Sequence, residues 1–434
     1  MEGSQPSGPA SSEATTRLGS SAVFCETGAV NAAATNKVFT LQEPSRFLNV
    51  MAACRGSIDL SDVSLAEMWS LTAMAARARA DGRDPVALEW EQSSAAFGFA
   101  TAVGLAEVVQ GVHGRVQGEE GRTVRLTRVC EEKEIQPVAF EIGRLLAGEK
   151  PANEASRLAI EYVIIELLRN VVQHSEDVLG GVVGAQRNDR GLHANRPVFQ
   201  VSVADNGQGI RATMSRTHPD LIEDDVALEQ ALWPYHSGAF APGRSGGVEN
   251  AGLGLFYISE LAKALEGRLL VSSGSASLLI DPGLTTRIER LAVGYPGTLV
   301  AFEIPTELPE GFASVFERIG EMASERSPRR LTREWLSYEA PPAGAKRFVV
   351  APFLENNDMA QHLAQQQLIP SLVKKEAVVL DFSNVRVITQ SFAHALLFEA
   401  LRCAWASQTR LYVANAQSVV RSALRHVEMY AQGG

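Results

Sequence analysis

Three polar residues recur at four-residue intervals within residues 161–176, EYVIIELLRNVVQHSE. Because an α-helix has about 3.6 residues per turn, Glu166, Asn170 and His174 would share one row on its surface. A carboxylate, a carboxamide oxygen and an imidazole in a row are suited to Mg²⁺ and phosphate chemistry. The alternative interpretation is a solvated helix face. The apolar residues between them predict the stripe that would anchor the helix to a core: Val163, Ile164, Leu167, Leu168, Val171 and Val172.

Two glycine-containing segments further along the chain have residues whose chemistry complements this row. The segment DNGQG (205–209) follows an alternating stretch that predicts a strand. The segment AGLG (251–254) leads into a predicted helix over Leu253–Leu265. An Asp at a strand end can accept a hydrogen bond from the adenine amino group, and bare N–H groups at a helix N-terminus favour phosphate. Gly297-Thr298, at the start of another predicted strand, is a weaker fourth piece.

The order of these segments resembles the GHKL ATPase superfamily, which includes gyrase, heat-shock chaperone ATPases, histidine kinases and mismatch-repair ATPases. ELLRNVVQH is similar to its N box, DNGQG to its first glycine box and NAGLGL to its second. The resemblance covers residues 122–306. It implies an α/β sandwich, with helices on one face of a mixed sheet, that binds ATP and Mg²⁺.

The resemblance also implies a role for each site residue. Glu166 would be the catalytic or orienting carboxylate, Asn170 the Mg²⁺ ligand and Asp205 the adenine contact. Thr298 would support the adenine. The glycines that would line the nucleotide are Gly207, Gly209, Gly252 and Gly254.

The segments on either side of this domain favour smaller α/β units. Residues 1–21 are rich in Ser, Gly and Pro and predict a disordered tail. Residues 37–114 show a strand–helix–strand–helix order, and residues 346–432 repeat it after a linker over 307–345. DLSDV (59–63) and DFSNV (381–385) occupy equivalent places in the two units. Both units resemble STAS domains, the C-terminal one more closely.

STAS proteins are phosphorylated by GHKL kinases in bacterial partner-switching systems, at a Ser or Thr that starts one helix. Here that region offers Thr389 and Ser391, but the usual Asp-Ser-Ser-Gly is replaced by TQSF (389–392). Ser391 is also a natural helix N-cap, and this structural role is the favoured interpretation.

Composition limits the function classes. The chain has 434 residues, 45% hydrophobic and 21% charged, which is typical of a globular protein with two or three domains. A formal charge of −10 argues against non-specific nucleic-acid binding. The four cysteines lack metal-site spacing. With no long apolar run and no secretion signal, we expect a cytoplasmic protein without membrane contact.

Together these observations predict a regulatory protein that binds Mg-ATP and controls a protein partner, with residues 211–250 as a mobile lid. The γ-phosphate would be hydrolysed, or transferred to a hydroxyl as in an anti-sigma-factor-like Ser/Thr kinase. One alternative is a non-catalytic ATP sensor. Another is a scaffold whose STAS-like ends assemble a homo-oligomer.

Overall fold

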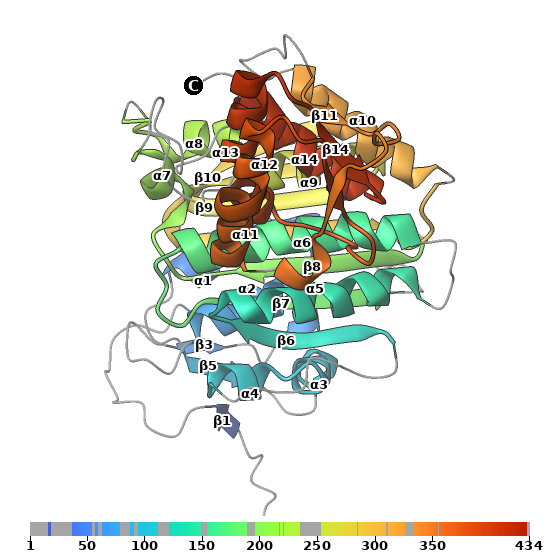
Figure 1. Ribbon diagram of the computed structural model, residues 1–434. Helices are drawn as coiled ribbons and strands as arrows, with labels where there is room; N and C mark the ends of the chain where they lie inside the picture. Colours follow the sequence, from blue (N-terminus) through green and yellow to red (C-terminus); the bar gives the residue numbers. More distant parts are fainter. Residues whose placement is uncertain are drawn as a thin grey trace, which may run out of the picture.

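A five-stranded antiparallel sheet lies at the centre of the molecule (Figure 1). The computed structural model describes residues 16–18, 37–53, 57–59, 63–78, 87–90, 94–111, 121–148, 154–188, 196–216, 218–219, 221–234, 253–283, 285–309, 311–325, 334–354 and 356–431. The strand order is β6-β7-β8-β10-β9. These strands are β6 (Thr123–Val129), β7 (Gly181–Asn188), β8 (Val198–Ala204), β9 (Arg268–Asp281) and β10 (Thr285–Pro305). Every residue of β8 is buried, because both faces of the sheet are covered.

One face of the sheet carries four helices: α5 (Glu132–Ala147), α6 (Glu154–His174), α9 (Gly254–Ala264) and α10 (Phe312–Glu325). Figure 1 shows α5 and α6 side by side across the sheet. Helix α6 is the one predicted from the polar row. It is buried on all sides over residues 157–169, and so it is a core helix rather than a surface helix with one apolar stripe.

The N-terminal segment covers the opposite face. Its helices are α1 (Pro44–Ala53), α2 (Met68–Arg77), α3 (Ala95–Ala102) and α4 (Leu105–Val109). Its strands are β1 (Thr16–Leu18), β2 (Lys37–Phe39), β3 (Ser57–Asp59), β4 (Val63–Ala66) and β5 (Ala87–Trp90). Trp69 and Leu71 of α2 share an apolar core with Leu270 and Leu299 of the sheet. The described part of this segment therefore shares its core with the sheet, and its STAS-like assignment stays a prediction.

The C-terminal unit has its own four-stranded parallel sheet, in the order β11-β14-β13-β12. The strands are β11 (Leu336–Ser337), β12 (Lys346–Val349), β13 (Val378–Asp381) and β14 (Leu411–Ala414). The helical elements are η2 (Ala351–Phe353), α11 (Asn357–Leu363), the π-helical η3 (Ala364–Leu368), α12 (Ile369–Val373), α13 (Gln390–Ser407) and α14 (Ser418–Ala431). Helices connect β12 to β13 and β13 to β14, the usual crossover between neighbouring parallel strands.

This unit begins earlier than residue 346, the predicted boundary. Trp335 belongs to its core, and β11 pairs with β14. The Glu428 carboxylate also accepts the backbone N–H groups of Trp335 and Leu336. Part of the predicted linker is therefore structured. Its helix α10 packs on α9 and α14, with Phe316 in the core of the central domain.

The α/β class is confirmed, but three finer expectations were wrong. The central sheet is antiparallel rather than mixed, because its neighbouring strands lack the parallel crossovers that the C-terminal unit has. Helices cover both of its faces, because the N-terminal segment packs behind it. The predicted tail contains a strand, since Thr16–Leu18 pairs with β5 through backbone hydrogen bonds that composition does not reveal.

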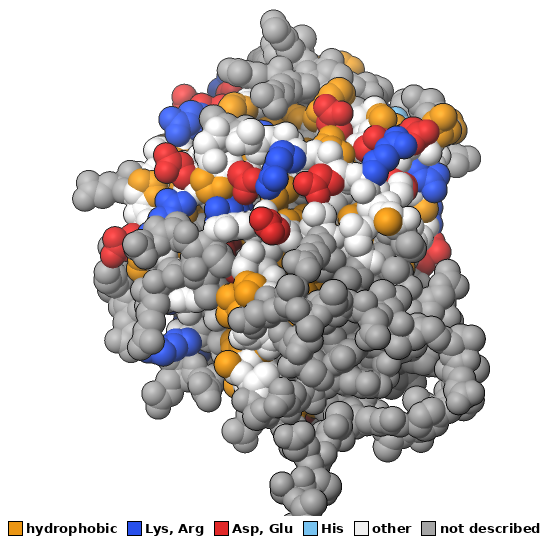
Figure 2. Space-filling view, turned by 180° about the vertical axis from the view of Figure 1, so that it is seen from behind, with side chains coloured by type: hydrophobic (Ala, Val, Ile, Leu, Met, Phe, Trp, Pro, Cys, Tyr) orange, Lys and Arg blue, Asp and Glu red, His pale blue; other side chains and the backbone are white. Residues whose placement is uncertain are grey.

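Two short helices lie in the connection predicted as a lid: α7 (Gly209–Met214) and α8 (Asp224–Ala231). Residues 235–250 of that connection lie outside the described part of the chain. Among the described helices, none combines the length and apolar content needed to cross a membrane. On the described part of the face in Figure 2, Lys and Arg side chains are interspersed with Asp and Glu.

The turn after β13 depends on one carboxylate. Asp381 accepts hydrogen bonds from Arg347 Nη1 at 2.6 Å, the Ser383 backbone at 2.9 Å and Asn415 Nδ2 at 2.8 Å. Burial raises the pKa of Asp381, but the hydrogen bonds from Asn415, Ser383 and Arg347 outweigh it and lower that pKa to about 2. The ionised carboxylate therefore stabilises the turn.

We expect Asp381→Asn to lower the free energy of unfolding of the C-terminal unit by ~1–3 kcal/mol at pH 7, because charge-assisted hydrogen bonds are lost. The folded pKa lies below the ordinary value of 3.8, so this stabilisation is present above pH 3.8 and disappears as the pH falls towards about 2. Hydrogen exchange of the β13 and β14 amides would measure it. The control is Asp358→Asn, at an exposed position of α11. Equal protection in both variants would contradict the role of Asp381.

Candidate functional site

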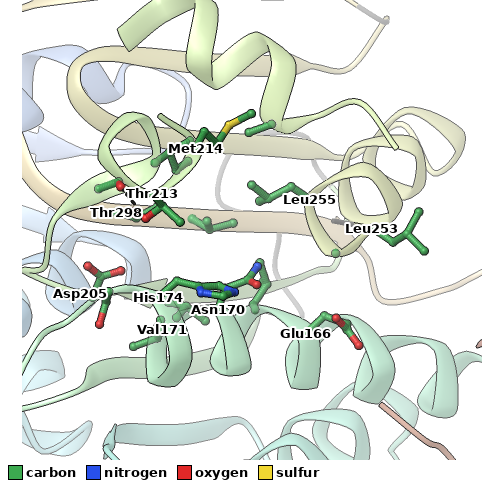
Figure 3. Close-up of a pocket in the computed structure, with 18 residues that line it drawn as sticks. Glu166, Asn170, Val171, His174, Asp205, Thr213, Met214, Leu253, Leu255 and Thr298 are labelled. Atoms are coloured by element: carbon green, nitrogen blue, oxygen red, sulfur yellow. Dashed lines mark hydrogen bonds between the residues drawn. The ribbon is translucent and has the colours of Figure 1, made fainter. Parts of the chain in front are cut away.

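The polar row of α6 forms one wall of a pocket (Figure 3). Glu166, Asn170 and His174 all line it. The Asn170 and His174 side chains lie at the cavity, whereas the Glu166 carboxylate points away from them (Figure 3). Counted out to the open solvent at its mouth, the hollow has about 860 Å³ of empty space.

Asp205 closes one end of the pocket. It is 4% exposed. Its backbone N–H donates to Thr298 O at 2.9 Å, and its Oδ1 accepts the Gly207 N–H at 2.9 Å. β10 therefore fixes the Asp205 backbone, and the turn after β8 fixes its carboxylate. The close approach of these segments explains two glycines. A Cβ at Gly207 would lie 2.0 Å from Ser175 O, and Gly297 has a φ of +75° with Asp205 O 2.3 Å from a Cβ.

Ser273 on β9, which was not among the predicted site residues, links the start of α7 to β10 beside the pocket. Its hydroxyl donates to Gly297 O at 2.8 Å and accepts the Ile210 N–H at 2.9 Å. Ile210 belongs to α7, whose first residue, Gly209, also lines the pocket. This buried serine therefore holds the start of α7 and strand β10 against β9. A serine in a strand carries no sequence signal for such a role.

The rest of the lining is mostly apolar. It comes from α6, from β8 and β10, and from α7, α8 and the start of α9: Leu167, Val171, Val203, Ile210, Met214, Ala231, Leu253, Leu255 and Val300. Apolar walls with a buried carboxylate at one end suit a flat ring that carries a hydrogen-bond donor. The sequence pattern places these residues on strands and helices. It does not indicate which cavity their side chains face.

Burial dominates the charges of the α6 row. Burial raises the pKa of Glu166, which is 1% exposed, although Arg169 and the Gln390 backbone N–H act in the opposite direction. Burial lowers the pKa of His174, and the nearby Arg216 lowers it further. His174 is therefore favoured as a neutral imidazole, and Glu166 is a stronger proton acceptor than an exposed carboxylate.

Six of the predicted site residues come together in this pocket: Glu166, Asn170, Asp205, Gly209, Gly254 and Thr298. Gly207 lies in the turn beside Asp205 without lining the pocket. Gly252 lies outside the described residues. No group of three or more His, Cys, Asp or Glu side chains suited to a metal ion occurs in the part of the chain that the structure describes. A metal at Asn170 would therefore take most of its ligands from a bound anion and water.

We expect Ser273→Ala to loosen the junction, because it leaves the partly buried Ile210 N–H and the buried Gly297 C=O without their Ser273 partner. The local cost should be ~1–3 kcal/mol, seen as faster hydrogen exchange in a peptide covering residues 205–214. Ser272→Ala is the matched control, since the adjacent Ser272 makes only a 3.4 Å hydrogen bond to Ala276 O. If both variants exchange equally, Ser273 does not hold the junction.

Comparison with known proteins gives a result for the C-terminal unit. Residues 360–402 match a family described as a STAS-like domain of unknown function (DUF4325). They run from α11 into α13 and include Gln390 and Ser391. No curated protein matches the chain. The C-terminal unit therefore contains a STAS-like domain segment, as the sequence predicted, and this segment provides the backbone N–H that reaches Glu166.

Proposed function

We propose that this protein binds Mg-ATP in the pocket between α6, α7 and α9, as a GHKL-type ATPase does, and uses the bound state to control a protein partner. The observation that carries the proposal is the convergence of separate segments. The α6 row, the DNGQG turn, the start of α9 and Thr298 are far apart in the sequence, yet they line one pocket.

The Asp205 end of the pocket suits adenine. A buried carboxylate can accept a hydrogen bond from the adenine amino group, whereas guanine presents a carbonyl oxygen at that position. The bond from the Gly207 N–H keeps the carboxylate in place. Apolar side chains such as Val203, Met214 and Val300 would contact the faces and edges of the ring.

The Asn170 end suits phosphate. The carboxamide oxygen of Asn170 is a hard ligand of the kind that Mg²⁺ accepts beside phosphate oxygens and water. Gly254 begins α9, an 11-residue helix whose N-terminal N–H groups favour negative charge. When bound, Mg²⁺ would neutralise charge on the phosphates.

Glu166 is the candidate for proton transfer. Burial raises its pKa, which strengthens it as a base for an attacking hydroxyl or water. The attacking group would be water in a hydrolase and a protein hydroxyl in a kinase. An ATP sensor without turnover would use only the Asp205 and Asn170 ends.

Binding is tested first, by calorimetry with ATP and GTP. We expect Asp205→Asn to weaken ATP binding about 10–100-fold and to reduce the preference over GTP, because a hydrogen bond to a charged group is worth ~1.5–3 kcal/mol. Asn170→Ala should remove the Mg²⁺ dependence of the affinity. Asp358→Asn, the same change at an exposed position of α11, should bind as wild type does. Lack of Mg-ATP binding by the wild-type protein would refute the proposal.

Turnover is tested with γ-labelled Mg-ATP. We expect the label to leave ATP, about 10²–10⁴-fold more slowly in Glu166→Gln because the general base is lost. Free phosphate would identify a hydrolase. Label on the protein that is lost in Ser391→Ala but kept in Thr389→Ala would identify a kinase acting in cis. Binding without either product would contradict the turnover and favour the sensor.

A further inference from the structure

The carboxylate of Glu166 is held by the C-terminal unit. Its Oε1 accepts the backbone N–H of Gln390 at 3.2 Å. Gln390 is the first residue of α13, an 18-residue helix, so this N–H has no partner within the helix. The positive end of the α13 dipole therefore faces a buried negative group.

The next turn of α6 makes a second contact with the same helix end. Arg169 donates from Nη1 to Ser391 Oγ at 2.8 Å and from Nη2 to Glu132 Oε1 at 3.1 Å. Thr389, not Ser391, is the N-cap of α13, because its side chain accepts the Phe392 N–H at 3.1 Å. The Ser391 hydroxyl is thus engaged across the interface rather than in capping its own helix.

The C-terminal unit has an apolar core of its own, largely distinct from that of the central domain. That core runs from Trp335 to Ala431 within one cluster. Only Val387 and Val419 of this unit belong to the core of the central domain, among the described residues. Other contacts across this interface are a buried ring contact, with the Tyr257 and His426 centroids 5.9 Å apart, and two polar ones. The Tyr257 and Ser422 hydroxyls lie 2.7 Å apart, and the Arg386 guanidinium lies 4.6 Å from the Phe140 ring centroid.

The orientation of Glu166 connects this interface to the pocket. The Glu166 carboxylate points away from Asn170 and His174 (Figure 3). Its Oε1 instead accepts the Gln390 backbone N–H. We propose that the docked C-terminal unit is an autoinhibitory element, which holds Glu166 turned away from the phosphate end of the pocket. This inference rests on the proposed function. When α13 leaves α6, Glu166 loses its partner and becomes available to the attacking group. The Asp205 end makes none of these contacts, so docking affects turnover and leaves nucleotide affinity nearly unchanged.

The test disrupts docking at positions remote from the pocket. Arg386→Glu combined with Ser422→Arg reverses one contact and places a long cation beside Tyr257. The control is Arg410→Glu, the same charge change at an exposed position before β14. Mg-ATP affinity and the rate of γ-phosphate release or transfer are measured on the full chain.

We expect the double variant to turn over Mg-ATP at least fivefold faster than wild type, with affinity within twofold and with Arg410→Glu unchanged. Adding Glu166→Gln should abolish the increase. Hydrogen exchange should rise at residues 390–392 while β13 stays protected, which shows undocking without unfolding. If ATP binds but the undocked variant is no faster, or is slower, the inference is overturned and the proposed site stands. If the wild-type protein does not bind ATP, both are overturned. If β13 loses protection, the double variant has unfolded the C-terminal unit. The single variant Arg386→Glu then replaces it, and the same rate and affinity comparison decides.

Discussion

The burial of α6 is the constraint on which the arrangement of the central domain and the C-terminal unit depends. From residue 157 to residue 169 the helix has no exposed side, yet it carries Arg157, Glu161, Glu166 and Arg169. A buried charge without a partner is far too costly to keep, so each of these groups must be matched. Arg157 and Glu161 pair with each other on the helix. The other two find partners on α5 and on the C-terminal unit, which ties both to the same core helix.

Local features of the candidate site could be predicted because short-range chemistry specifies them. The four-residue spacing placed Glu166, Asn170 and His174 on one face, and DNGQG marked a turn that only glycine can occupy at residue 207. Contacts between residues that are distant in the sequence could not be predicted. The sequence contains nothing that would place Ser273 between α7 and β10, or Gln390 at Glu166, since these contacts join residues 24 to 224 positions apart. The carboxylate of Glu166 also does not join Asn170 and His174 at the cavity as the spacing suggested, because it turns towards α13.

The N-terminal segment shows the same limit on a larger scale. Its alternating strands and helices were recognised, but packing on the back of the sheet was not. Polar groups connect the layers there. The Gln200 amide on β8 donates to Glu67 and Glu303, and the Thr72 and Ser202 hydroxyls lie 2.6 Å apart. Arg77 reaches the turn itself, with Nη1 3.3 Å from Asn206 Oδ1. The segment therefore braces the Asp205 end from behind, a role that composition alone could not indicate.

The two ends of the pocket are thus held by different kinds of contact. Backbone hydrogen bonds and tight glycine turns fix Asp205 within one domain, while Glu166 is held by a hydrogen bond to a unit with its own core. A ligand shifts such an equilibrium only as far as it interacts differently with the docked and released states. If a bound nucleotide attracts or repels the Glu166 carboxylate, it must change docking by the same factor by which docking changes its affinity. Near-equal affinity in the two states would then mean that the C-terminal unit responds mainly to a partner, which would compete with α6 for the end of α13.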